Sequence, residues 1–252
     1  MLGPSSAETL FDLGLGDRVV GVSDYCVHPL AAGKDRLGGQ WNPDVERIAA
    51  LAPDLLVLQG AFPELETLAA QLGIATLPLL TDDWEGWLRE VVLFGARFDV
   101  PEAAAALSAA KRAELDQVRA AAAAAGIGGR PALLIIGRWP GQAAGLVVAG
   151  AASFLSEMLT AAGGRNVFAD NPRDYFDLDE EALIRAAPEV IFDLRPGGED
   201  DAQDLLATWR DAFPGVPAVR SGRVFVLTQD FILLPGPRMP QIARLFQERL
   251  AD

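Results

Sequence analysis

The sequence predicts an α/β fold of two similar lobes with mostly parallel sheets, joined by one long helix, with a ligand cleft between the lobes. The first observation is an internal repeat: residues 44–58 and 179–193 both read as a capped helix, a proline and a buried strand. Pro53 and Pro188 are 135 positions apart (188 − 53 = 135). The second is a regular alternation of strand and helix patterns, typical of parallel sheets. The third is a long alanine-rich segment between the two copies. Clefts between domains are common sites for small ligands.

Each element of the first half has local signals. Residues 5–13 predict a helix, with Ser5 and Glu8 at capping-box spacing and Gly14 at its end. Asn42 is expected to cap a later helix, with Pro43 at the first helical position. The other expected elements are strands at 19–22, 54–58 and 76–80 and helices at 63–72 and 83–94.

The middle of the chain predicts one uninterrupted helix. Residues 101–125 are rich in Ala, Leu, Glu, Lys and Arg, and a helix of that length spans about 37 Å. We therefore divide the chain into an N-terminal α/β lobe at 1–96, a bridging helix at 97–127 and a C-terminal α/β lobe at 128–252. The second half predicts strands at 132–136, 190–194 and 224–227 and helices at 154–161, 179–187, 200–213 and 240–251. Asp177 repeats Asn42 as a cap, and a second repeated block pairs Gly16 with Gly163 (163 − 16 = 147).

Composition narrows the class of partner. The 252 residues carry 35 acidic and 21 basic side chains, and a net charge of −14 argues against nucleic acid and anionic membranes. No apolar run reaches the ~18 residues of a spanning helix, and the start lacks the basic and apolar parts of a signal peptide. We expect a monomer without membrane insertion. It is cytoplasmic if the start is native, and periplasmic or tethered to the cell surface if the start is trimmed.

Aromatic side chains are expected in loops that lie after the predicted strands or next to the predicted caps. Ligands of parallel sheets bind beyond the carboxyl ends of the strands, where a large planar ligand would stack on such rings. Trp41 and Phe176 are repeat-equivalent (176 − 41 = 135), so we expect them to face each other across the cleft. Packing within the protein is the open alternative for each aromatic residue. The candidates are Tyr25, Trp41, Phe62, Trp139, Phe176 and Phe231.

The sequence argues against several other chemistries. With one His and one Cys, no closed zinc site of the usual kind can form, and no G-x-S-x-G nucleophile motif is present. Cys26 and His28 are two positions apart, so in an extended segment both would face one side, and an axial ligand to a cobalt or iron centre is one interpretation of the pair. The alternative is a loop cysteine and a hydrogen-bonded histidine.

Five segments resemble the helical-backbone class (class III) of solute-binding proteins for ABC importers: residues 8–22, 25–29, 42–48, 51–55 and 235–238. The resemblance covers nearly the whole chain and implies a binding protein without catalytic cofactor. Its transported ligand would be cobalamin, delivered to a membrane ABC permease. Asp230 matches an acidic ligand-contacting position of the cobalamin binders, but Leu234 stands where their arginine is expected. A ferric siderophore or haem is the alternative ligand, and a cytoplasmic bilobal chelatase-like enzyme is the alternative from another class.

Glu64 and Glu199 each follow a repeat proline by 11 positions (64 − 53 and 199 − 188). Both are expected near the start of a helix, where an acidic side chain gains ~0.3–1 kcal/mol from the helix dipole. The resemblance implies a further role, in which the pair docks the two lobes onto a two-fold symmetric permease.

Overall fold

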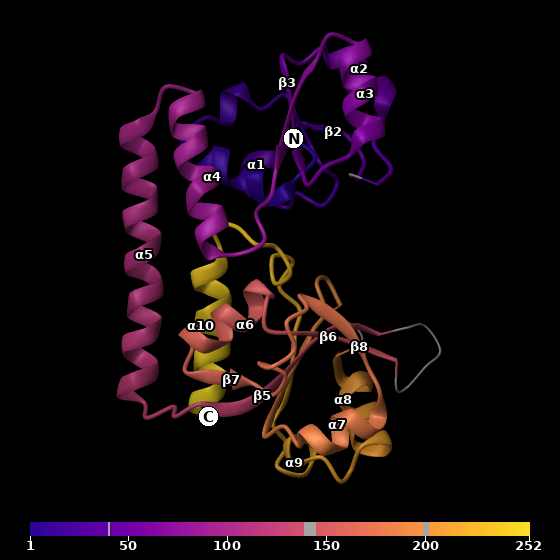
Figure 1. Cartoon of the computed structure of the whole chain (residues 1–252), viewed down its shortest axis with the longest axis vertical. Helices are drawn as coiled ribbons and strands as arrows, with labels where there is room; N and C mark the ends of the chain where they lie inside the picture. The colour runs from indigo at the N-terminus through magenta and orange to yellow at the C-terminus, as the bar shows by residue number, and fades with distance from the viewer. Residues whose placement is uncertain (40, 139–144, 199–201) are drawn as a thin grey trace. The chain divides into compact units, whose positions relative to one another are not determined.

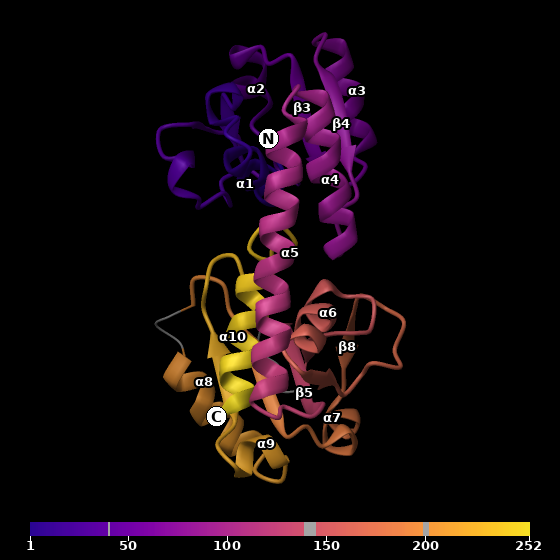
Figure 2. The ribbon, with the colours of Figure 1, turned by 90° about the vertical axis from the view of Figure 1, so that its left-hand side faces the viewer.

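The computed structural model describes residues 1–39, 41–138, 145–198 and 202–252. The chain forms two compact units. Unit 1 contains Met1–Arg112 and Leu234–Pro237, and unit 2 contains Ala113–Leu233 and Arg238–Asp252. The division falls inside helix α5 (Pro101–Ala124), which is uninterrupted as expected (Figure 2). The predicted three-part division at 96/97 and 127/128 stays a prediction. Within the described ranges, no helix has both the length and the apolar character needed to cross a bilayer.

Unit 1 is built from short parallel strands and covering helices (Figure 1). Strand β1 pairs with β2, and strand β3 pairs with β4, both in parallel. Apolar side chains of β3, α2 and α3 form its core around Leu56, Leu58 and Ile48. The elements are α1 (Pro4–Asp12), β1 (Gly21–Val22), β2 (Asp35–Arg36), α2 (Val45–Leu51), β3 (Leu55–Gln59), α3 (Pro63–Gln71), β4 (Ala75–Leu79) and α4 (Trp84–Arg97). Two 3₁₀ turns, Gly16–Arg18 and Pro29–Ala31, flank β1.

Unit 2 contains a six-stranded mixed sheet in the order β10-β9-β5-β6-β8, with β7 also pairing with β5. The pairs of β5 with β7 and β9, and of β9 with β10, are parallel, whereas β6 pairs antiparallel with β5 and β8. The mostly parallel prediction is therefore right, but the strands β6 and β8 were missed. The elements are β5 (Arg130–Arg138), β6 (Leu146–Ala149), α6 (Phe154–Ala161), β7 (Gly164–Asn166), β8 (Tyr175–Leu178), α7 (Glu180–Ala186), β9 (Val190–Leu194), α8 (Ala202–Ala212), α9 (Pro217–Arg220), β10 (Val224–Leu227) and α10 (Met239–Ala251).

Alternating side chains of β9 pack on opposite faces of this sheet. Ile191 lies in the core cluster with Trp209 of α8, whereas the ring of Phe192 packs 4.7 Å from that of Phe246 in α10. Figure 1 accordingly shows α7, α8 and α9 on one side of the sheet and α6 and α10 on the other. Unit 2 is therefore a three-layer α/β/α structure, with the carboxyl ends of β5, β9 and β10 side by side.

The structure corrects three local predictions. The helix caps are Asp44 and Asp179, whose carboxylates accept hydrogen bonds from the Arg47 and Ala182 amides, so Asn42 and Asp177 were wrong. Both pairs are 135 positions apart, so the repeat allowed either choice. Ser5 lies inside α1, which starts at Pro4 after Gly3 without a side-chain cap, so the capping box was also wrong.

The second repeated block has a different register from the expected one. Gly163 follows helix α6 in the left-handed conformation (φ +85°), and the glycine in the same position after α1 is Gly14 (φ +76°). Gly16 instead begins a 3₁₀ turn. The pairing of Gly16 with Gly163 was therefore wrong, because the position that requires a positive φ comes directly after the helix cap.

Candidate functional site

An apolar groove lies at the carboxyl end of β3 in unit 1. Its volume is about 590 Å³. The indole of Trp41 packs edge-on against the ring of Phe62 at 5.0 Å, and Trp41 remains 88% exposed. The remaining lining residues are Pro43, Val45, Ala61, Pro63, Glu64, Leu65 and Leu68. An indole so exposed above an apolar floor is available for stacking on a ligand.

The start of α3 holds this groove in place. Phe62 precedes the first residue of α3, and its backbone N–H donates to Glu66 Oε1 at 2.9 Å. Glu64 lies in the first turn, is exposed, and also lines the groove. The structure therefore brings two candidate ligand contacts, Trp41 and Phe62, together with one candidate docking residue.

Tyr25 and His28 follow β1 in the same unit. Tyr25 is 67% exposed, and its ring lies over Gly39, where a Cβ would come within 2.9 Å of Cε2. His28 is half-buried and stacks on Phe11 at 5.0 Å, and its Nδ1 accepts from the Leu30 amide at 3.1 Å. A neutral imidazole with an accepting Nδ1 carries its proton on Nε2.

Cys26 is fully buried and His28 is hydrogen-bonded through Nδ1 outside any strand, so of the two interpretations the structure favours a loop cysteine and a hydrogen-bonded histidine. Among the described residues, no group of three or more His, Cys, Asp or Glu side chains could hold a metal ion.

In unit 2, the structure gives the predicted ligand contact Phe176 a different position from the one expected. Phe176 lies in strand β8 opposite Val148 and packs edge-on against Phe168 at 5.3 Å, next to the unit 2 core. Its expected place in a loop was therefore wrong. Trp139 and Glu199 lie outside the described residues.

Asp230 and Phe231 lie beyond the carboxyl end of β10 and share one arginine. Arg238 Nη1 is 3.3 Å from Asp230 Oδ1, and its guanidinium carbon lies 4.3 Å from the Phe231 ring centroid. An arginine thus does accompany Asp230, eight positions later instead of four. The motif at residues 235–238 contained this signal, because its last residue is the arginine.

A charged cluster at the carboxyl ends of β5 and β9 was not predicted from the sequence. The Asp193 carboxylate is fully buried and forms ion pairs with Arg138 at 2.7 Å and Arg195 at 2.9 Å. An aspartate inside the apolar run Val-Ile-Phe-Asp-Leu was the available signal, because buried charges are rare unless paired.

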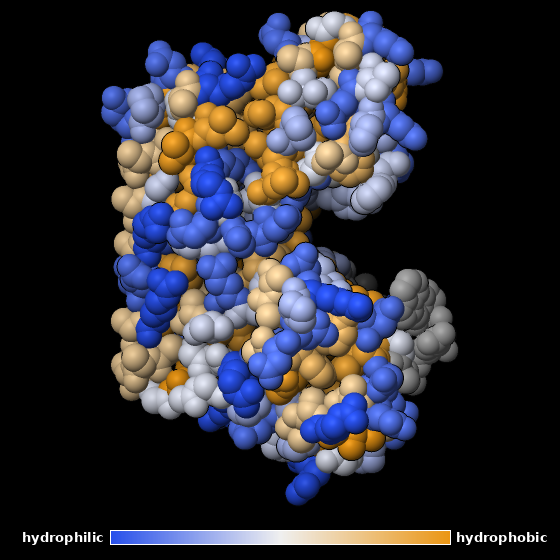
Figure 3. Space-filling view, viewed as in Figure 1, coloured by the Kyte–Doolittle hydropathy of each residue, from blue (hydrophilic) through white to orange (hydrophobic). Residues whose placement is uncertain are grey.

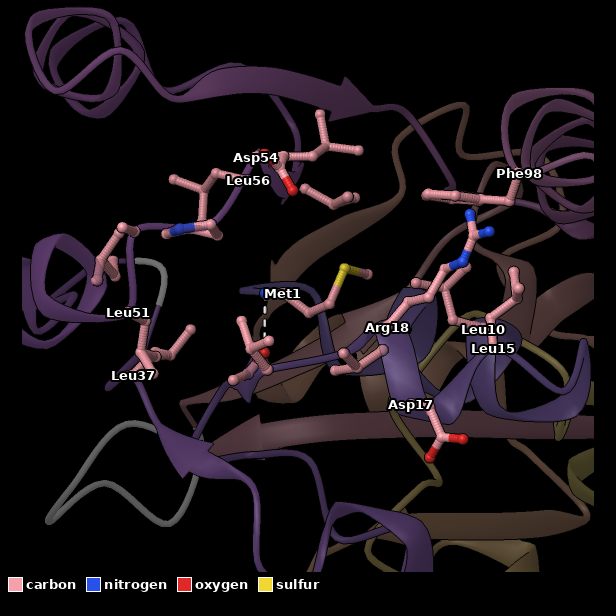
Figure 4. Close-up of a pocket in the computed structure, with 18 residues that line it drawn as sticks. Met1, Leu10, Leu15, Asp17, Arg18, Leu37, Leu51, Asp54, Leu56 and Phe98 are labelled. Carbon is pink, nitrogen blue, oxygen red and sulfur yellow. Dashed lines mark hydrogen bonds between the residues drawn. The ribbon is translucent and has the colours of Figure 1, made fainter.

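A second hollow of unit 1, of about 460 Å³, lies between β1 and the start of β3 (Figure 4). The Met1 amino group donates to the Gly21 carbonyl at 3.0 Å, and the Leu2 amide donates to the Val57 carbonyl at 3.0 Å. Burial lowers the pKa of that amino group to about 5. None of the predicted ligand-contacting residues lines this hollow. It lies at the amino end of β3, the opposite end from the groove.

Other apolar surface of unit 1 lies outside both hollows. Val92 and Leu93 of α4 are exposed, and Figure 3 shows apolar surface over the region of α1 and α4. These side chains line neither hollow. Of these two hollows in the described part of unit 1, the Trp41 groove is the one at the carboxyl end of a strand.

Comparison with known proteins identifies the group to which the chain is similar. The profile of the family described as "Periplasmic binding protein" matches residues 1–231. The vitamin B12-binding protein of Vibrio parahaemolyticus is 28% identical over 249 residues, covering 94% of this chain and 83% of that protein. The vitamin B12-binding protein of Photorhabdus laumondii is 28% identical over 258 residues, covering 100% and 86%.

Solved structures share the fold. The periplasmic heme-binding protein BhuT in complex with two hemes superimposes with a TM-score of 0.85 at 28% identity, over 99% of this chain and 96% of that one. The vitamin B12 binding protein BtuF of Vibrio cholerae gives 0.80 at 23% identity, over 99% and 94%. The predicted α/β fold is confirmed, and a ligand cleft between lobes stays a prediction.

Proposed function

The chain belongs to the periplasmic binding protein family, and from that membership we propose that it binds a corrinoid of the cobalamin type and delivers it to the permease of an ABC importer. Family members are substrate-binding proteins of ABC transporters and not enzymes, so the chelatase-like alternative is set aside. Members are periplasmic or surface-tethered, and we propose the same location, and a monomeric state, for this protein.

The observation that carries the ligand proposal is the exposed Trp41–Phe62 pair in an apolar groove at the carboxyl end of a parallel strand. A corrinoid presents a large ring surface that such aromatic side chains can cover. Relatives named as vitamin B12-binding proteins support this choice of ligand. Tyr25, His28, Trp139, Phe176, Asp230 and Phe231 complete the proposed set of contacts.

Titration with cyanocobalamin tests the proposal. Trp84, Trp87 and Trp209 are buried, so among the described tryptophans only Trp41 can be quenched by direct ring contact, and the quenching that disappears in Trp41→Ala measures that contact. Trp41→Ala should weaken binding by about 1–3 kcal/mol. Val92→Ala, an exposed apolar side chain of α4 outside the groove, is the matched control. Absence of binding in calorimetry at micromolar concentrations would end the corrinoid proposal.

Haem or a ferric siderophore is the second candidate ligand, and one observation favours haem. Tyr25 is exposed, and a phenol oxygen can ligate ferric iron. If haem is the ligand and Tyr25 its iron ligand, ferric haem should give a shifted Soret band that Tyr25→Phe alters. A ferric siderophore already saturates its iron, so its affinity should survive that change.

For the permease, we propose that Glu64 and Glu199 are docking residues on the two units. Glu64 is exposed in the first turn of α3 and has no ion-pair partner among the described residues. A repeat-related pair of acids suits a partner with two-fold symmetry, and exposed charges act mainly on encounter and orientation.

The chain offers a matched control for docking. Glu46 and Glu181 are exposed acids in the first turns of α2 and α7, and they are 135 positions apart (181 − 46 = 135), like the docking candidates. Glu64→Arg with Glu199→Arg should abolish delivery to a reconstituted importer, whereas Glu46→Arg with Glu181→Arg should not. Because Glu64 lines the groove, ligand affinity must be measured in the same variants. Equal transport by both double variants would contradict the docking proposal.

A further inference from the structure

Two arginines share one buried carboxylate at the carboxyl edge of the unit 2 sheet. Asp193 Oδ2 accepts from Arg138 Nη2 at 2.7 Å and from Trp209 Nε1 at 3.0 Å. Its Oδ1 accepts from Arg195 Nε at 2.9 Å. Arg138 is the last residue of β5, and Arg195 directly follows β9. The group therefore lies at the edge where parallel sheets bind ligands.

Counted over the described residues, the cluster carries one more positive charge than negative charge. One carboxylate faces two guanidinium groups, and within the described residues Arg138 and Arg195 form no ion pair except with Asp193. The Arg138 side chain is 12% exposed, and its buried Nε makes no hydrogen bond to the described residues. Arg195 is 31% exposed, and no described acceptor binds its two terminal nitrogens. Arg195 thus offers solvent a planar pair of donors.

The backbone and the packing hold these donors in position. The Arg195 amide donates to the Leu227 carbonyl at 2.7 Å, which ties the end of β9 to the end of β10. The Arg138 guanidinium lies over the Trp209 ring at 4.7 Å. Arginines fixed in this way lose little freedom when they bind a planar anion in a bidentate manner.

The repeat shows that the backbone does not require these charges. At an offset of 135, Asp193 corresponds to Leu58, and Arg195 corresponds to Gly60. The Gly60 amide donates to the Leu79 carbonyl at 2.7 Å, the same contact that Arg195 makes with Leu227. Burying a charge costs free energy even when the charge is paired. Asp193 and Arg195 are therefore better explained by a function than by a requirement of the fold.

We propose that Arg195, oriented by Asp193 and backed by Arg138, binds an anionic group of the transported ligand, a carboxylate or a phosphate oxygen. The inference rests on the proposed function, because it assumes that a ligand reaches this edge. Arg138 and Asp193 are positioning residues in this scheme. The site selects acidic ligands over otherwise identical neutral ones.

The test compares acidic ligands with neutral counterparts, on wild type and Arg195→Gln. Cobinamide and its monocarboxylic acid derivative test a carboxylate, cobalamin adds a phosphodiester, and haem with its dimethyl ester tests carboxylates on another ring. For the acidic partner that uses the site, Arg195→Gln should lower affinity about tenfold, the size of a charge-assisted hydrogen bond. The neutral partner should change less than about twofold. An Arg195-dependent affinity for the cobinamide acid would identify a carboxylate oxygen as the bound group, and an Arg195-dependent affinity for cobalamin would identify a phosphate oxygen.

Two controls separate this role from a structural one. Arg185→Gln removes an exposed arginine from α7 and should change no affinity. Arg195→Lys keeps the charge but loses the planar pair of donors, so it should restore only part of the acidic ligand's advantage. Equal losses for the acidic and the neutral partner in Arg195→Gln, or no loss for either, would overturn the proposal.

The outcomes also separate this inference from the corrinoid proposal. If no corrinoid binds but haem binds better than its dimethyl ester in an Arg195-dependent way, the corrinoid proposal fails and the arginine site stands. If corrinoids bind and Arg195→Gln has no charge-selective effect, the corrinoid proposal stands and the proposed arginine site fails. Failure of all five probes to bind would overturn both.

Discussion

The α2–β3 segment of unit 1 and the α7–β9 segment of unit 2 have matching backbones at an offset of 135 and carry different chemistry. Each helix is capped by an aspartate, Asp44 or Asp179, and each ends in a left-handed alanine directly before the proline. After the strands the two differ. Unit 1 presents an apolar groove with an exposed indole, whereas unit 2 presents a buried carboxylate with two arginines. The repeat determines the backbone of both segments, and the side chains at the carboxyl ends of β3 and β9 determine what each unit can bind.

The largest expected effect concerns the charged cluster of unit 2. Asp193→Ala should destabilise the protein by about 3–5 kcal/mol, because it leaves the Arg138 guanidinium buried and unpaired. Asp193→Leu with Arg138→Met, which gives β9 the residue of its counterpart Leu58, should recover most of that loss. Urea unfolding of both variants measures the difference. Equal stability of the two would mean that the unpaired charge is not the cause.

The second prediction contrasts the central strands of the two units. In unit 2, strand β5 pairs with both β7 and β9, whereas in unit 1 the described contacts between β1 and β3 run through Met1, which donates to Gly21, and Leu2, which donates to Val57. For a chain starting at Met1, the folded amino group has its pKa lowered from 8.0 to about 5. Between pH 5 and 8 the unfolded state binds a proton that the folded state does not, so stability should rise with pH, by at most about 4 kcal/mol.

Amino-terminal acetylation provides the control for this effect. It removes the titrating group, so the stability difference between acetylated and free protein should shrink as pH rises from 5 to 8. Thermal melts across this range measure it. A constant difference would show that the amino group does not become neutral in the folded protein.

The third prediction concerns the other buried acid. Glu90 of unit 1 has hydroxyl neighbours, including a hydrogen bond from Thr81, and burial raises its pKa above the ordinary 4.5. The folded state therefore keeps a proton that the unfolded state releases, so stability should fall as pH rises above 4.5. Glu90→Gln should remove this decline. Melts on acetylated protein avoid the opposite trend from Met1, and an unchanged slope in Glu90→Gln would contradict the prediction.

The smallest effect is expected at the two left-handed alanines. Ala52 has φ +42° and Ala187 has φ +44°, in a region that disfavours side chains with a Cβ. Ala52→Gly and Ala187→Gly should each stabilise the protein by about 0.5–1 kcal/mol, since relieved strain outweighs the added freedom of the unfolded chain. Unfolding midpoints measure both. If one substitution stabilised the protein and the other destabilised it, the two helix ends would not be energetically equivalent.

The sequence by itself determined the order of most helices and strands, because the signals for these elements are local. Pro53 and Pro188 ended the repeated helices, alternation predicted the parallel strands, and the Ala-rich segment at 101–125 gave α5 to within one residue. Local signals left some choices open. Asn42 and Asp44 are both good caps two positions apart, and only the hydrogen bond to the Arg47 amide shows which one starts the helix.

Only the tertiary structure decided which side chains meet at the sites. Phe176 was placed in a loop because its strand, β8, is defined by antiparallel pairing with β6, about 30 residues earlier in the chain. Asp193 meets Arg138 from β5 and Trp209 from α8, and Trp41 meets Phe62 across the whole of α2 and β3. Such meetings depend on strand order and register, which bring together residues that no local pattern connects.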